Sequence, residues 1–162
     1  MKNPLTLSIL PAALLLGTLA CSSQDYQIGV DAAKRGDYAT ALREWKPLAD
    51  QGHAGAQFNL GWMYRQGKGV PQDFRQAARW TRRSAEQGYA AAMGGLAVMR
   101  AAGKGVIQDD ILAYMWGNLG AAEGNEFAKK VRDRVSKSMT PSQLQEGQRL
   151  SRECLGKNYK GC

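Results

Sequence analysis

Apolar residues recur at three- and four-residue spacing along most of this 162-residue chain, and short glycine-rich segments separate the stretches. In the clearest pair of stretches, the first carries a stripe on one helical side: Ala56, Leu60, Met63 and Tyr64. The second carries a stripe with similar spacing: Ala77, Trp80, Ser84 and Ala85. Such spacing predicts two helices, each with one buried side, joined by a turn.

The turn between these helices has a near-copy later in the chain. Residues 67–73 read Gly-Lys-Gly-Val-Pro-Gln-Asp, and residues 103–109 read Gly-Lys-Gly-Val-Ile-Gln-Asp, 36 positions further on. At the same offset, residues 53–88 and 89–124 agree well beyond the turn. A period of this length, with a glycine turn between two helices, is typical of repeat solenoids. The predicted fold is therefore all-α, an α/α solenoid of helix-pair repeats.

Two less regular segments flank the two clear repeats. Residues 26–52 form a partial first repeat with a shorter turn and with Pro47 inside its second helix, where proline bends or weakens one turn. Residues 125–162 are predicted to form a C-terminal capping helix pair followed by a tail. The first of these helices, at residues 125–139, has a basic side, and Thr140 begins the second through a capping box. Polar end helices close the open end of a solenoid.

Glycines interrupt the second helix of the later repeat. Gly117 and Gly120 lie inside this helix, and a helical glycine costs about 0.5–1 kcal/mol relative to alanine. We therefore expect this helix to be the least stable of the core set.

The first residues of the chain have the pattern of an export signal. A positive start precedes an apolar run at residues 5–19, which is too short to span a bilayer comfortably. Cys21 follows a degraded form of the bacterial lipobox, in which the cysteine is acylated, and ordinary cleavage after Ala20 fits the same residues. We expect a signal peptide at residues 1–20, then a short tether at residues 21–25.

The three cysteines agree with an exported protein. Cys154 and Cys162 lie together near the end of the chain, and in an oxidising compartment they are expected to form a disulfide. A bridge across so short a loop contributes roughly 2–3 kcal/mol on the chain-entropy model. This bridge leaves Cys21 as the remaining cysteine, and lipidation would modify its thiol. The alternatives are a free thiol or a bond between molecules.

The formal net charge of +8 at pH 7 suits contact with an acidic partner. Basic residues gather on two predicted helices, at residues 75–83 and 129–137. A solvated helix face is the ordinary interpretation of each cluster, and an acidic protein, anionic lipid or glycan are the alternatives. Export argues against nucleic acid as the partner, despite the high isoelectric point.

The chain offers little catalytic chemistry. His53 is its single histidine and no cysteine pair has zinc-ligand spacing, so no metal is expected. Residues 67–69 precede a helix, but a nucleotide-binding P-loop needs Gly-Lys-Ser/Thr after a strand. No recognisable nucleophile motif accompanies His53, which is expected to be surface structure between repeats. We expect neither a cofactor nor catalytic residues.

The repeats share a set of alternating positions. In the second repeat these are Ala56, Leu60-Gly61, Tyr64, Gly67, Gly69-Val70, Asp73, Ala77, Trp80, Ala85 and Gly88. In the third they are Ala92, Leu96, Gly103, Gly105-Val106, Asp109, Ala113, Trp116, Ala121 and Gly124, with Arg100 in place of the tyrosine. This pattern resembles the Sel-one-like repeat family, relatives of the tetratricopeptide repeats. The resemblance implies a right-handed stack whose inner surface binds protein partners, and it carries over no catalytic residues.

A candidate partner surface lies on the first helix of the second repeat. Phe58, Trp62 and Arg65 share one side at i, i+4 and i+7, a composition typical of binding hot spots. Their equivalents in the third repeat are small and could form a shallow floor: Gly94, Val98 and Ala101. The alternative is that Phe58 and Trp62 simply pack against the preceding repeat.

Together these features predict an envelope-located module for protein–protein interaction. It would act as an adaptor, scaffold or inhibitor, of which an immunity-type protein is one version. The alternative is an enzyme or binding protein that acts on peptidoglycan or related glycans, a role that the resemblance also leaves open. The expected location is the periplasm, with a lipid anchor at Cys21 to the outer membrane; otherwise the protein is soluble in the periplasm or secreted. The sequence leaves the oligomeric state open.

Overall fold

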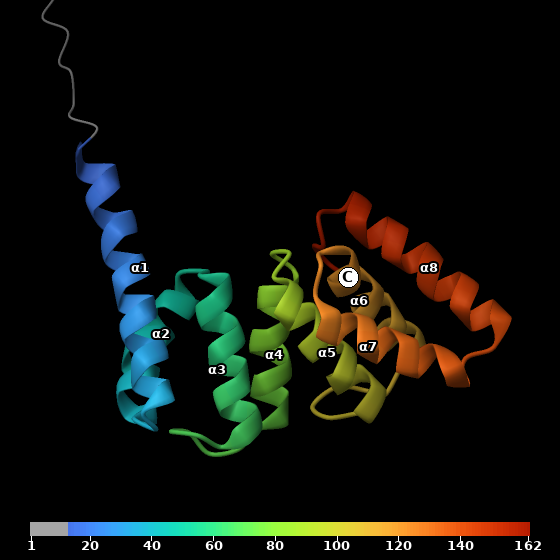
Figure 1. Ribbon diagram of the computed structural model, residues 1–162, viewed down its shortest axis with the longest axis horizontal. Coiled ribbons are helices and arrows are strands. Elements are labelled where there is room, and N and C mark those ends of the chain that lie inside the picture. The colour runs from blue at the N-terminus through green and yellow to red at the C-terminus, as the bar shows by residue number, and fades with distance from the viewer. Residues whose placement is uncertain (1–12) are drawn as a thin grey trace, which may run out of the picture.

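The computed structural model describes the backbone of residues 13–162 and the surroundings of side chains from residue 23 onward. In this part of the chain all regular structure is helical (Figure 1). The helices are α1 (Ala13–Lys34), α2 (Tyr38–Asp50), α3 (Ala54–Gln66), α4 (Phe74–Ala85), α5 (Ala90–Ala102), α6 (Asp110–Ala122), α7 (Glu126–Val135), the 3₁₀ turn η1 (Ser136–Ser138) and α8 (Pro141–Gly156). The predicted all-α repeat fold is confirmed.

The helices follow one another along the long axis of the molecule, from α1 at one end to α8 at the other (Figure 1). Each helix packs on the next through α7, while α8 packs on α6, and α7 also lies against α5. Buried tryptophans fill the core once per repeat, Trp45, Trp80 and Trp116. The indole N–H of Trp45 donates to the carbonyl of Tyr26 at 3.2 Å, which ties α2 to α1.

The structure differs from the prediction at the start of the chain. Helix α1 begins at Ala13, so the tether expected at residues 21–25 is helical instead. Residues 13–35 contain no proline, and extending an existing helix adds a hydrogen bond for each residue that is fixed. The signal peptide lies largely outside the described residues and the Cys21 side chain lies outside them, so both remain predictions. None of the described helices is long and apolar enough to cross a membrane.

The first capping helix also ends earlier than predicted. The expected helix at residues 125–139 is divided into α7 and the turn η1. The hydroxyl groups of Ser136 and Ser138 donate to the carbonyls of Asp133 and Val135. Serine side chains that bond the local backbone in this way compete with the regular helical pattern.

The glycine-rich turns set how far one repeat lies from the next. Gly69 and Gly105 have φ near +70°, a conformation that other residues adopt only at a cost. A Cβ on Gly69 would lie 2.8 Å from the Cβ of Tyr38, at the start of α2. A Cβ on Gly105 would collide with the backbone carbonyl of Phe74, at the start of α4. In each repeat, therefore, the second glycine of the turn lets the chain lie against the preceding repeat.

The helix caps on both sides of these turns are alike in the two repeats. Gly67 and Gly103 end α3 and α5 in the left-handed conformation. Asp73 and Asp109 then cap α4 and α6, their carboxylates accepting hydrogen bonds from backbone N–H groups. Arg100 replaces the family tyrosine without changing the turn, because its carbonyl accepts from Asp109 N–H at 3.0 Å just as Tyr64 accepts from Asp73.

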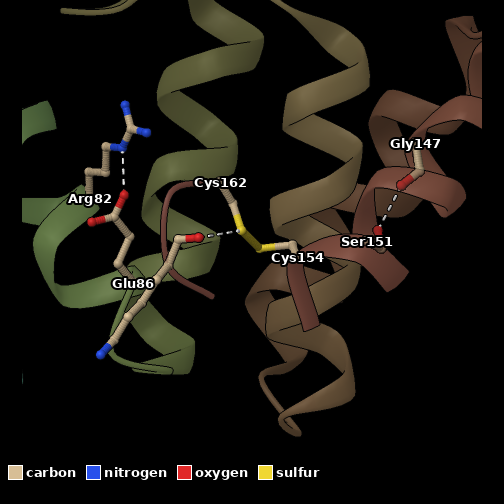
Figure 2. Close-up of a disulfide and its surroundings, with 7 residues drawn as sticks. Arg82, Glu86, Gly147, Ser151, Cys154 and Cys162 are labelled. Atoms are coloured by element: carbon tan, nitrogen blue, oxygen red, sulfur yellow. Dashed lines mark hydrogen bonds and ion pairs between the residues drawn. A yellow bond between two sulfur atoms is a disulfide. The ribbon is translucent and has the colours of Figure 1, made fainter. Parts of the chain in front are cut away.

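The C-terminal tail folds back over the stack. Thr140 begins α8 with the expected capping box, and Cys154 near its end is bridged to Cys162, with the two Cα atoms 5.7 Å apart (Figure 2). Within the tail, Tyr159 donates to Glu123 at 2.5 Å, and its ring lies beside Gly88. The tail therefore covers the ends of α4 and α6.

Candidate functional site

Three adjoining pockets lie along the side of the stack formed mainly by α1, α3, α5 and the start of α7. The first pocket lies between α1 and α3, with Tyr26, Val30, Lys34 and Trp62 among its lining residues. The central pocket lies between α3, α5 and α7, with Phe58, Trp62, Arg65, Met99 and Phe127 in its lining. The third pocket lies toward the glycine turns, and includes Arg65, Phe74, Met99 and Lys104.

The three residues predicted as a partner surface all line the central pocket: Phe58, Trp62 and Arg65. Helical spacing puts them on one side of α3, and the tertiary structure turns that side toward α5 and α7. The pocket has a volume of about 170 Å³, below the roughly 300–1,000 Å³ of most small-molecule sites. Its size suits one side chain of a larger partner.

Phe58 and Trp62 also take part in packing between repeats. Trp62 lies against Tyr38 of the preceding repeat, with ring centroids 6.1 Å apart. Phe58 packs instead against Tyr89 of the following repeat, at 5.5 Å. Both side chains are half-buried. Each ring therefore has one side in the core and another facing the pocket, so the packing role and the surface role coexist.

The shallow floor expected from Gly94, Val98 and Ala101 is not formed as predicted. Gly94 is buried, and a Cβ there would lie 3.1 Å from the ring of Phe127 and 3.2 Å from Ala128 in α7. Val98 lines the third pocket, and Ala101 packs against the core near α8. The reason is that α7 covers this side of α5. The pattern of the preceding repeats does not predict this cover.

Phe127 is a pocket residue that sequence reasoning missed. Its side chain is 54% exposed although it is large and apolar, and it borders the central pocket from the first turn of α7. One feature of the sequence indicates that Phe127 is exposed. Phe127 stands outside the apolar stripe of this helix, formed by Ala128, Val131, Val135 and Met139, and beside basic residues.

Positive charge surrounds the pockets. Lys34 lines the first pocket, Arg65 lines the central and third pockets, and Lys104 lines the third. Among residues 23–162 no carboxylate lines any of the three. Lys34 lies 3.5 Å from Asp31, and Lys104 lies over the ring of Phe74 at 5.5 Å. The guanidinium of Arg65 makes no ion pair within the described part of the chain. It is therefore available to a partner.

The basic clusters elsewhere are partly neutralised. Arg82 pairs with Glu86 at 2.9 Å, and the Arg83 guanidinium lies 4.9 Å from the centre of the Trp80 ring. On α7, Lys129 pairs with Glu126 at 3.7 Å. Exposed ion pairs of this kind contribute little to stability. Together these contacts fit a solvated helix face better than a binding site.

A larger pocket of about 650 Å³ lies along α8. Arg152, which lines this pocket, makes no ion pair within the described part of the chain, whereas Arg149 forms ion pairs with both Glu146 and Glu153. The Arg149 guanidinium lowers the pKa of Glu146 through a hydrogen bond, and Glu146 raises the pKa of Arg149. This arrangement leaves no unpaired charge on those groups to hold a ligand.

His53 has a structural position. It is the N-cap of α3, where its Nδ1 accepts a hydrogen bond from the Ala56 N–H at 3.1 Å. Its ring stacks on Tyr26, with centroids 4.7 Å apart. In the described part of the chain, no cluster of three or more His, Cys, Asp or Glu residues could hold a metal ion.

Comparison with known proteins settles the family. A family model for the Sel1 repeat matches residues 54–89 and 90–125. A Sel1 repeat protein from Oxalobacter formigenes, of known crystal structure, is 33% identical with a TM-score of 0.63; the match covers 70% of this chain and 88% of that one. The chain belongs to the Sel1 repeat family. Sel1 repeat proteins mediate protein–protein interactions, and the fold is typically a scaffold for them.

A second structure supports the Sel1 repeat assignment over more of the chain. The protein c5321, a protective antigen present in uropathogenic Escherichia coli strains and displaying an SLR fold, is 30% identical with a TM-score of 0.79. That match covers 85% of this chain and 31% of c5321. The fold of the Sel1 repeats therefore extends over most of the chain, which corresponds to about a third of the larger protein.

Curated relatives are matched over a short stretch. DAP3-binding cell death enhancer 1 from Rattus norvegicus and from Mus musculus are each 36% identical over 50 residues, which is 31% of this chain. The matched stretch is 10% of each relative's length. The similarity to these relatives therefore covers less than a third of this chain.

Proposed function

We propose that this Sel1 repeat protein is an interaction module of the bacterial envelope, an adaptor, scaffold or inhibitor, and that it binds an acidic protein partner at the central pocket. The observation that carries this proposal is the pocket itself. Aromatic side chains line it, its volume suits a single side chain, and Arg65 in its lining makes no ion pair with any residue that the structure describes. Aromatic residues and arginine are the residue types that dominate binding energy at protein interfaces.

The comparisons support a protein partner in a general way. Sel1 repeats mediate protein–protein interactions, and one relative carries protein binding in its name, DAP3-binding cell death enhancer 1. The envelope location is supported by the sequence pattern of residues 1–20 and by Cys21. We propose no catalytic activity, because no residue in the three pockets that could act as a nucleophile is paired with a residue that could act as its base.

Cross-linking in the producing cells tests the partner and the pocket together. The wild-type chain should trap one dominant protein, and the double variant Trp62→Ala with Arg65→Glu should trap much less of it. Circular dichroism and thermal melting establish that the double variant is folded, since Trp62 also packs on Tyr38. Arg79→Glu, the same charge change on an exposed residue outside the pockets, is the matched control and should trap the partner normally.

A screen against cell-wall fragments separates this proposal from the glycan alternative. Purified protein should neither cleave peptidoglycan fragments nor bind them tightly. Turnover, or tight binding that Trp62→Ala removes, would replace the adaptor role by a glycan-directed one.

Incorporation of labelled fatty acid tests the anchor separately. The wild type should take up the label and Cys21→Ser should not. Absence of label in the wild type, with the protein still recovered outside the cytoplasm, would establish a soluble exported protein and leave the partner proposal intact.

A further inference from the structure

The three pockets adjoin one another across α1, α3 and α5, and together they are called the groove. Trp62 lines both the first and the central pocket. Arg65 and Met99 line both the central and the third pocket. A ligand that fills one pocket is therefore placed at the edge of the next, and Trp62 is the ridge between the first two.

The groove has an apolar side and a basic side. Tyr26 and Val30 of α1, Phe58 of α3 and Phe127 of α7 supply apolar surface in the first two pockets. The three cations stand nearer the glycine turns: Lys34 in the last turn of α1, Arg65 in the last turn of α3, and Lys104 just after the end of α5. The basic groups thus lie along one edge of the groove, one at or near the end of each of α1, α3 and α5.

No acidic side chain interrupts this edge from within the groove. Among residues 23–162 the only charged residues that line the three pockets are Lys34, Arg65 and Lys104. Three carboxylates lie near this edge. Asp31 lies 3.5 Å from the Lys34 ammonium group, and Asp73 and Asp109 cap the helices that follow and accept hydrogen bonds from backbone N–H groups. Charge complementarity therefore selects an anionic ligand with apolar side chains.

The spacing of the pockets limits the conformation of such a ligand. The first and central pockets lie on opposite sides of α3, and an α-helix with its side chains is roughly 10–12 Å across. In an extended polyproline-type segment, side chains three residues apart project on the same side and are separated by roughly 9 Å. Two such side chains fit on the two sides of Trp62.

We infer that the groove binds an extended acidic peptide segment of the partner, with two bulky apolar side chains roughly three residues apart. One apolar side chain enters the first pocket and the other the central pocket, on either side of Trp62. Aspartate or glutamate side chains of the segment face Lys34, Arg65 and Lys104. This inference rests on the proposed function and specifies the chemistry that the partner presents.

Selection of random dodecapeptides on phage, with the purified full-length chain as bait, tests the inference without knowledge of the partner. The enriched peptides should be net negative and should carry two bulky apolar residues at the stated spacing. A synthetic peptide of the consensus, labelled with fluorescein, should bind roughly tenfold or more weakly to Trp62→Ala. Its binding should also weaken as salt is raised.

A charge exchange separates a direct contact from a general loss of structure. Arg65→Glu should weaken the acidic peptide by about tenfold or more, while a peptide with lysine in place of its acidic residues should bind Arg65→Glu better than the wild type. Arg79→Glu should change neither affinity. Basic or uncharged consensus peptides, a single apolar anchor, a seven-residue spacing typical of a helix, or no enrichment at all would each overturn the inference.

The consensus peptide also distinguishes this inference from the proposed function. A cellular partner whose cross-linking the peptide blocks supports both. A partner that is trapped but not displaced by the peptide refutes the groove inference and leaves the adaptor role standing. Tight, charge-dependent peptide binding with no partner trapped in cells refutes the adaptor role and leaves the groove chemistry standing.

Discussion

The second and third repeats share one template, yet one side of the stack is open beside the second and closed beside the third. Thr81 of α4 lies between α3 and α5, against Gly61 and Gly95. The equivalent residue of the third repeat, 36 positions on, is Gly117, and there α7 packs directly on α5. A Cβ at Gly117 would lie 3.0 Å from the Cβ of Arg132 in α7.

A second pair of equivalent positions shows the same difference. Ser84 of α4 is buried and donates to the carbonyl of Ala54 at 2.7 Å. Its counterpart is Gly120, where a Cβ would lie 2.7 Å from the Cβ of Ala128. Small residues let α7 approach α5, whereas a threonine holds α3 and α5 apart. The central pocket is the space that remains where the neighbouring helices do not close.

The same two glycines make tertiary contacts that act against the weakness predicted for α6. Gly117 and Gly120 were expected to make it the least stable helix of the core, because each glycine weakens an isolated helix. In the structure both are buried, and α6 packs against α5, α7 and α8. Glycine here allows close helix packing, and that tertiary contact offsets the weaker local preference.

The largest effect is expected where both repeats depend on their turns. Gly105→Ala would put a Cβ onto the Phe74 carbonyl at a positive φ, and should destabilise the protein by about 3 kcal/mol or more. Gly124→Ala is the matched control, since Gly124 has φ +80° but nothing within 4 Å of a Cβ. It should cost only about 1 kcal/mol. Urea denaturation measures both, and equal losses would mean that close packing of the turn contributes nothing.

The tail tests how far the third repeat depends on its cover. Reduction of the Cys154–Cys162 bridge should lower the free energy of unfolding by roughly 2–3 kcal/mol on the chain-entropy model. Cys162→Ser should show a similar loss and should not respond to reductant. Denaturation curves with and without reductant check this. An unchanged midpoint in the wild type would show that the bridge does not hold the tail on the ends of α4 and α6.

The closed side of α5 should open when a residue of the second repeat is placed at the equivalent position of the third repeat. Gly117→Thr places the residue found at position 81 between α5 and α7, and overpacking of this kind should cost roughly 1–3 kcal/mol. Hydrogen exchange should increase in α7 more than in α3. Thr81→Ser, a smaller change at the equivalent position, is the control and should leave α7 protected. Protection of α7 unaltered in Gly117→Thr would contradict the close-approach explanation.

The smallest expected effect is a dependence on alkaline pH. The hydrogen bond from Tyr159 to Glu123 raises the pKa of Tyr159 above its ordinary value of 10.0. The folded state thus favours the neutral phenol, so this stabilisation is complete below about pH 10 and is lost as pH rises through the folded pKa. As the pH is raised above 9, the free energy of unfolding of the wild type should fall slightly more than that of Tyr159→Phe. Parallel losses in the two proteins would show that the contact contributes nothing.

Much of the fold follows from local sequence signals. The turn at residues 67–73 and its copy predict the helix pairs, and the N-cap and glycine positions follow from backbone chemistry that acts within a few residues. The capping box at Thr140 is of the same kind. The side of α3 that carries Phe58, Trp62 and Arg65 is also predictable, because helical periodicity alone puts them on one side.

The pocket beside these residues depends on contacts between distant segments. Whether α5 lies open or covered is decided by α7, and Phe127 reaches the pocket from that helix. Periodicity within one helix carries no information about which helix will cover it, since the contact joins segments far apart in the chain.

The sequence by itself determined the helical repeat, its turns and its caps, because each of these needs only neighbouring residues. The tertiary structure decided which gap between helices closes and which remains a groove. Gly117 and Thr81 show the physical reason: the distance between two helices depends on the side chains of a third element that lies between them. A repeat pattern can assign both residues to the same position, but only packing shows that one allows a helix to approach and the other keeps a pocket open.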